Sequence, residues 1–145
     1  MSPAAGPLEK KALDIAVMFR RIRKAVEPYP KAAMFELADR GFNTPFQQLV
    51  ACLISVRTFD EVSLPAAIRL FTRAGNAAEI GALAANEIDM LIYPATFHER
   101  KSAQIRALAK QVVEQYGGQL PCDRDLMMSF GLDFSLFKPR SKAYP

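Results

Sequence analysis

Apolar residues recur at helical spacing through most of this chain, whereas the alternation typical of a half-buried strand is almost absent. Within residues 15–26 they fall at i, i+3, i+4, i+7 and i+11, with basic residues around the stripe. Pro28 and Pro30 must end this helix, because proline lacks the amide hydrogen that a helix interior uses. A length of 145 residues suits one domain with a buried core. These patterns predict a single all-α domain.

Residues 44–47, Thr-Pro-Phe-Gln, carry the clearest helix start. They read as an N-cap, a proline at the first helical position and a glutamine that completes a capping box. The apolar face behind this start is predicted to lie in the core. It consists of Phe46, Leu49, Val50, Leu53 and Ile54.

The next helix is predicted to be capped by Asp60 or Ser63 and to end near Gly75. Pro65 is compatible with this helix only in the first turn, where the missing backbone N–H of proline costs no intrahelical hydrogen bond. Two short helices follow, capped by Asn76 and Asn86.

A long helix is expected from about His98 to Tyr116, with glycines 117 and 118 as its left-handed C-terminal cap. Residues 121–123 then open a short last helix. The prediction is an orthogonal bundle of about seven short helices. Residues 131–145 show no useful helical stripe, so we divide the chain into a helical part, 1–130, and a divergent tail, 131–145.

The amino-acid composition excludes only a few classes of function. Lys and Arg number 19 against 15 Asp and Glu, a mild excess that is compatible with a nucleic-acid partner. No apolar run approaches the roughly 18 residues of a membrane-spanning helix, and the start lacks a signal-peptide pattern, so a cytoplasmic location is expected. Cys52 and Cys122, with one histidine between them, indicate neither a metal site nor a disulfide, and Cys52 is expected in the core.

Three segments resemble one known family, in the same order. Residues 43–61 (NTPFQQLVACLISVRTFDE) resemble the early helix and following loop of endonuclease III-type DNA glycosylases. Residues 91–103 (LIYPATFHERKSA) resemble their second DNA-facing loop, and residues 116–121 (YGGQLP) the turn toward their helix-hairpin-helix. The similarity spans about residues 11–130 and implies an incomplete helix-hairpin-helix glycosylase-like domain. The family excises damaged bases, which are flipped out of the duplex.

By this resemblance, Arg57 occupies the position of the residue that fills the gap left by the flipped base. Phe97 lies where an apolar side chain wedges into the opposite strand. Arg100 and Lys101 are expected near phosphates. The full set of expected DNA-binding residues is Arg57, Thr58, Phe97, His98, Arg100 and Lys101. The ordinary alternatives stay open: a solvated loop residue for Arg57, an anchor of the long helix for Phe97 and a surface side chain for His98.

The family pattern stops at Gly131. The family has Leu-Pro-Gly-Val-Gly-x-Lys-Thr-Ala at this hairpin, whereas this chain has Gly-Leu-Asp-Phe at 131–134. Counterparts of the catalytic lysine, the catalytic aspartate and the four iron–sulfur cysteines are missing, and Asp133 and Lys138 are poor substitutes. We therefore expect no catalytic residue, no metal site and no cofactor, in a truncated or frame-shifted glycosylase.

Two hypotheses on function follow. The chain is a base-excision repair protein of the endonuclease III type that is inactive in this form, or a non-catalytic helical module that binds distorted DNA or a protein partner. The expected partner is double-stranded DNA with damaged or abasic sites. The chain is expected to be a monomer without membrane contact, and to lie at the nucleoid if DNA binding is retained. Val50, Leu53 and the 105–113 stripe are expected to be partly exposed, because the helices that close the family's core are missing.

Overall fold

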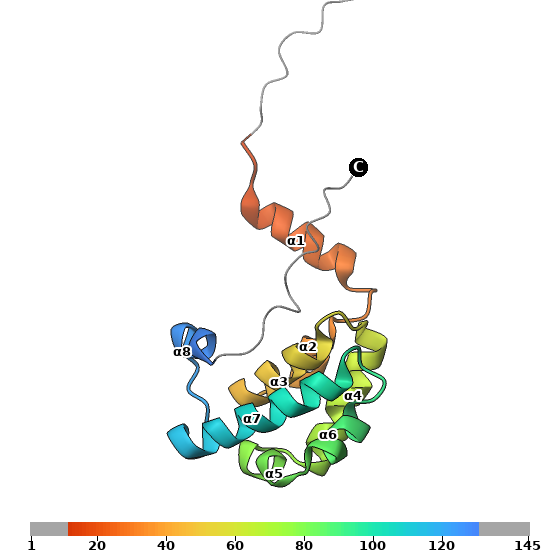
Figure 1. Ribbon diagram of the computed structural model, residues 1–145. Helices are drawn as coiled ribbons and strands as arrows, with labels where there is room; N and C mark the ends of the chain where they lie inside the picture. Colours follow the sequence, from red (N-terminus) through yellow and green to blue (C-terminus); the bar gives the residue numbers. More distant parts are fainter. Residues whose placement is uncertain (1–11, 131–145) are drawn as a thin grey trace, which may run out of the picture. The chain divides into compact units, whose positions relative to one another are not determined.

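The computed structural model describes residues 12–130, and within them all regular structure is helical (Figure 1). Eight helices follow one another in this part of the chain. They are α1 (Ile15–Val26), α2 (Ala33–Asp39), α3 (Pro45–Ser55), α4 (Asp60–Arg73), α5 (Ala77–Ala82), α6 (Ala85–Ile92), α7 (His98–Tyr116) and α8 (Arg124–Ser129). The predicted all-α class is confirmed. The predicted tail lies outside the described residues, so its boundary stays a prediction.

The chain divides into two compact units, Met1–Lys31 and Ala32–Pro145. The first contains α1, which begins where the Asp14 carboxylate accepts a hydrogen bond from the Val17 amide, at 3.1 Å. The helix has the bounds that its stripe predicts, but none of its residues is buried. Its apolar stripe is therefore largely exposed.

The second unit contains a continuous apolar core. Helix α7 packs against α3, α5 and α6, and α4 packs against α2, α3 and α6 (Figure 1). Fully buried side chains from five helices meet there. They include Val50, Ile54, Leu70, Ile80, Ile88, Ile92, Ile105 and Val112.

The expectation that α3 and α7 are partly exposed was wrong for most of the named residues. Val50 and Leu53 are buried, as are Ile105, Leu108, Ala109 and Val112 of the stripe, whereas Val113 is 38% exposed. The reason is that α2, α4 and α7 cover α3, while α5 and α6 cover α7. The described part of the chain closes this core itself.

Several helix ends have the predicted caps. The Thr44 hydroxyl accepts from the Gln47 amide and the Gln47 side chain accepts from the Thr44 amide, so the capping box is complete. Asn76 caps α5, and Asp123 caps α8. Gly117 ends α7 with φ of 62°, in the left-handed region that glycine adopts without strain.

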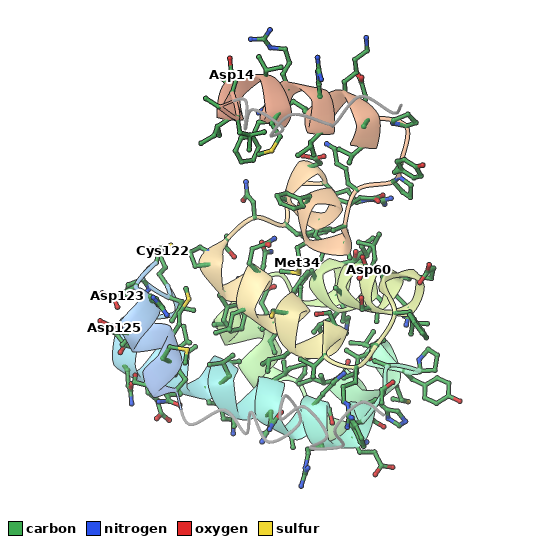
Figure 2. The ribbon with its side chains drawn as sticks, turned by 90° about the horizontal axis from the view of Figure 1, so that it is seen from above. Asp14, Met34, Asp60, Cys122, Asp123 and Asp125 are labelled. Carbon is green, nitrogen blue, oxygen red and sulfur yellow. The ribbon has the colours of Figure 1, made fainter. Side chains whose placement is uncertain are left out.

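The start of α4 corrects two predictions. Its N-cap is Phe59, so neither Asp60 nor Ser63 caps this helix, and Pro65 lies inside it instead of in its first turn. The Asp60 carboxylate instead accepts a hydrogen bond from the Ala33 amide, at 3.1 Å. Asp60 is labelled in Figure 2. It thereby satisfies a free amide at the start of α2, whose own N-cap makes no side-chain bond.

This long-range cap explains why α2 is missing from the sequence prediction: the residue that caps it lies 27 positions away. Two smaller predictions were also wrong. Asn86 lies inside α6, whose N-cap is Ala84. Cys52 is exposed, because it faces away from the buried side of α3.

No helix among residues 12–130 is long and apolar enough to cross a membrane.

Candidate nucleic-acid interface

Two loops carry the residues that the sequence singles out. The Arg57 loop (residues 56–59) joins α3 to α4, and the Phe97 loop (residues 93–97) joins α6 to α7. Within residues 12–130, Arg57 and Phe97 are the only residues other than glycine with positive φ, at 55° and 57°. An L-residue in this left-handed conformation costs roughly 1–2 kcal/mol. Strain of this kind concentrates at functional sites.

Both strained residues present their side chains to solvent. Arg57 is exposed, and Phe97 is 46% exposed. The first follows the C-cap of α3, and the second is the N-cap of α7. The protein therefore holds a cation and an aromatic ring at the tips of two loops, each in a fixed backbone conformation.

The Thr58 hydroxyl connects the two loops. Its oxygen accepts a hydrogen bond from the Thr96 amide at 3.0 Å, which ties the Arg57 loop to the Phe97 loop. The same hydroxyl donates to the Val56 carbonyl at 3.3 Å. Thr58 is thus a structural link between the loops, in addition to being a predicted site residue.

Lys101 lies under this link. Its Nζ donates to the carbonyls of Ile54 and Val56, at 2.8 and 2.7 Å, and to the Thr58 hydroxyl at 3.1 Å. These bonds use all three ammonium hydrogens, and the residue is only 1% exposed. The positive charge lies at the C-terminus of α3, where carbonyls carry partial negative charge.

The position of Lys101 corrects the expectation that it contacts a phosphate. A buried amine that binds three protein oxygens presents no donor to an outside ligand. The sequence held a signal for this, since Lys101, Ile105, Leu108 and Val112 share one helical face. Burial lowers the pKa of Lys101 to about 8.

His98 and Arg100 follow Phe97 at the start of α7. The His98 Nδ1 bonds to the Asp89 carboxylate of α6, and its ring packs edge-on against Tyr93, with centroids 5.2 Å apart. Arg100 is exposed. His98 therefore stabilises the Phe97 loop, and Arg100 lies on the solvent side of the same turn.

Sequence reasoning missed three residues that hold the Phe97 loop. Asp89 binds His98, and the Thr96 amide binds Thr58. Arg69 of α4 donates to the carbonyls of Leu91 and Tyr93, at 2.9 and 2.6 Å. These contacts join residues that lie 9 to 38 positions apart and in different helices or loops, so no pattern within one helix points to them.

Within residues 12–130, no group of three or more His, Cys, Asp or Glu could hold a metal ion. Both cysteines are free and exposed.

Comparison with known proteins shows which proteins this chain is similar to. No protein-family model matches the chain. It is 26% identical over 113 residues to endonuclease III of Synechocystis sp., covering 78% of this chain and 47% of the relative. It is also 26% identical over 94 residues to the thymine/uracil-DNA glycosylase of Pyrobaculum aerophilum, covering 65% of this chain and 41% of the relative. The chain is a distant homologue of the endonuclease III-type DNA glycosylases.

Solved structures agree with this homology at the level of fold. A trapped covalent endonuclease III–DNA intermediate and a non-covalent endonuclease III–DNA complex each superpose with a TM-score of 0.63 at 22% identity. Each match covers 80% of this chain and 51% of the solved chain. This chain spans less than half the length of the curated relatives it matches.

Proposed function

We propose that this chain binds double-stranded DNA at distorted sites, such as abasic or damaged positions, through the Arg57 and Phe97 loops. The observation that carries the proposal is the pair of left-handed residues, one cationic and one aromatic, at the tips of two hydrogen-bonded loops. The distant homology to endonuclease III-type glycosylases, whose solved complexes contain DNA, supports it. Within this proposal the chain belongs to base-excision repair.

The chemistry of the two side chains suits a disrupted base pair. A guanidinium can stack on a base and donate hydrogen bonds to its edge, so Arg57 can occupy the space that a missing base leaves. An aromatic ring replaces part of the stacking that the neighbouring base loses, and Phe97 supplies one on the second loop. Exposed Arg100 adds a positive charge for nearby phosphates.

The proposal is binding without base excision or strand cleavage. Lys101 has a lowered pKa, but its amine is buried and donates all its hydrogens to protein oxygens, so it is not a nucleophile. Residues 131–134 differ in sequence from the family's hairpin, which supplies the attacking lysine in that family's lyases.

The test is a binding titration with labelled duplexes that differ only in one tetrahydrofuran abasic analogue. Fluorescence anisotropy at low salt is expected to show tighter binding to the abasic duplex. Affinity for both duplexes should fall as salt increases, because phosphate contacts release counterions. Equal affinity for the two duplexes, or no binding, would contradict the proposal.

Two matched pairs of variants assign the effect to the loops. Arg57→Ala and Phe97→Ala are expected to lose most of the abasic preference. Lys110→Ala removes a charge from an exposed position of α7, and Met128→Ala removes an exposed apolar side chain from α8. These two variants should keep the preference; if they lose it to the same extent, the loops are not the binding surface.

The claim about catalysis has its own test. The chain is incubated with a duplex that contains a natural abasic site, with borohydride present to trap any imine. No covalent complex and no strand cleavage are expected. A trapped complex would show that an amine of this chain attacks the sugar carbon.

A further inference from the structure

We propose that Thr58 and Lys101 are positioning residues that couple the Arg57 loop to the Phe97 loop, so that the two side chains enter distorted DNA as one rigid unit. This inference rests on the proposed function. It adds that the two tips do not bind independently. The coupling follows from contacts that neither tip residue makes itself.

Lys101 is connected to both loops. Its backbone amide donates to the Phe97 carbonyl at 2.9 Å, in the first turn of α7. Its side chain reaches the carbonyls of Ile54 and Val56, the residues that precede Arg57. A displacement of the first turn of α7 therefore moves the ammonium group that holds the end of α3.

Thr58 completes the connection from the opposite side of Arg57. Its oxygen has one hydrogen to donate and two lone pairs to accept. The donor binds Val56, and the two acceptor positions bind the Thr96 amide and Lys101. The hydroxyl is fully used, so its replacement by a methyl group breaks the contact between the loops without changing the volume of the side chain.

The charged groups near this cluster have other partners or lie outside it. Asp60, at the start of α4, binds the Ala33 amide. Asp89 of α6 binds His98. Glu99 and Arg100 are exposed on α7, and Arg57 is exposed on its loop. The described bonds of the Lys101 amine are all to uncharged oxygens, so geometry and not ion pairing links the loops.

The experiment is a double-mutant cycle on the ratio of affinities for abasic and intact duplex. Arg57→Ala, Phe97→Ala and their combination are measured in the natural chain and in a Thr58→Val background. In the natural chain, each single change should already disable the shared unit. The fold-loss of abasic preference in the double variant should therefore be about tenfold smaller than the product of the two single fold-losses. In the Thr58→Val background the losses should multiply to within about twofold.

Two further variants separate coupling from a general effect on folding. Thr58→Ser keeps the hydroxyl and should restore the coupling. Ser55→Ala removes a hydroxyl near the same helix end, one that donates to the Cys52 carbonyl at 2.8 Å and has no described bond to the Phe97 loop. It should leave the coupling unchanged.

The outcomes distinguish this inference from the proposed function. If the natural chain shows no abasic preference, the proposed function fails and the coupling has no role in recognition. If the preference is present and Arg57 and Phe97 contribute independently in the natural chain, the coupling is refuted and the proposed function stands. Coupling that persists in folded Thr58→Val protein would likewise refute the role of Thr58.

Discussion

The helices of the second unit begin and end by different means. Helices α3, α5 and α8 begin with a side chain that caps its own helix, namely Thr44, Asn76 and Asp123. Three C-terminal ends, by contrast, depend on cations from other helices. Lys101 binds the end of α3, Arg106 binds Leu83 at the end of α5, and Arg69 binds Tyr93 at the end of α6.

This difference explains how the two loops of the candidate interface are held in place. A cap within one helix fixes only that helix, whereas a cation from a distant helix fixes the loop that follows the bound carbonyls. Lys101 and Arg69 hold the Arg57 and Phe97 loops in this way. Some of the basic residues of the chain therefore bind carbonyls of its own backbone.

The largest expected effect comes from removing the long-range cap of α3. Lys101→Met leaves two buried carbonyls and the Thr58 hydroxyl without their donor, so the free energy of unfolding should fall by about 2–3 kcal/mol. Urea unfolding followed by circular dichroism measures it. A loss no larger than that of a single local cap would show that the two kinds of helix end do not differ in strength.

The pH dependence of stability tests the same amine. Its pKa is about 8 in the folded chain, below the ordinary value of 10.5. Below about pH 8 both states bind the proton, so Lys101 adds no pH dependence. Between pH 8 and 10.5 the unfolded chain binds more protons, and the free energy of unfolding should rise with pH.

The measured quantity is the difference between the natural chain and Lys101→Met, which removes the contribution of other groups. This difference should rise by at most about 1.4 kcal/mol per pH unit. A difference that stays flat from pH 8 to 10.5 would mean that the amine keeps its ordinary pKa despite burial.

A smaller effect is expected at the local cap of the same helix. Thr44→Ala should lower the free energy of unfolding by about 1 kcal/mol, because one N-terminal amide of α3 loses its partner. The abasic preference should not change, since Thr44 lies at the opposite end of α3 from Arg57. Loss of the preference in folded Thr44→Ala would contradict the separation of the two ends.

The smallest effect has the opposite sign. Arg57→Gly relieves the left-handed strain and should raise the free energy of unfolding by about 0.5–1 kcal/mol. The same change should weaken binding to abasic duplex. Thermal unfolding measures the first effect and the anisotropy titration the second. A variant that is less stable than the natural chain and binds abasic duplex with the same affinity would show that the strain has no functional role.

Local patterns predicted much of the fold. The bounds of α1 and α7 and the capping box at Thr44 follow from spacing and cap residues within a few positions. Helix α2 could not be predicted in this way, because Asp60 caps it from 27 positions away. Asp60 was mispredicted for the same reason. Aspartate is a common N-cap residue and Asp60 lies at the start of α4, but its carboxylate binds an amide of α2.

The candidate site was predictable only in part. The sequence pointed to Arg57, Thr58 and Phe97 through a family resemblance, but the left-handed conformations have no sequence signal in an arginine or a phenylalanine. Lys101 was assigned to phosphates through the same resemblance, whereas the structure buries its side chain. Its place on the apolar face of α7 was visible in the spacing and pointed to burial.

The most direct test of the account is the ratio of affinities for abasic and intact duplex, measured for the natural chain and for the Arg57→Ala/Phe97→Ala double variant under one salt condition. The account predicts a clear preference for the abasic duplex in the natural chain and loss of that preference in the double variant, with residual salt-sensitive binding to both duplexes. A natural chain that binds both duplexes equally, or a double variant that keeps the preference, would contradict it.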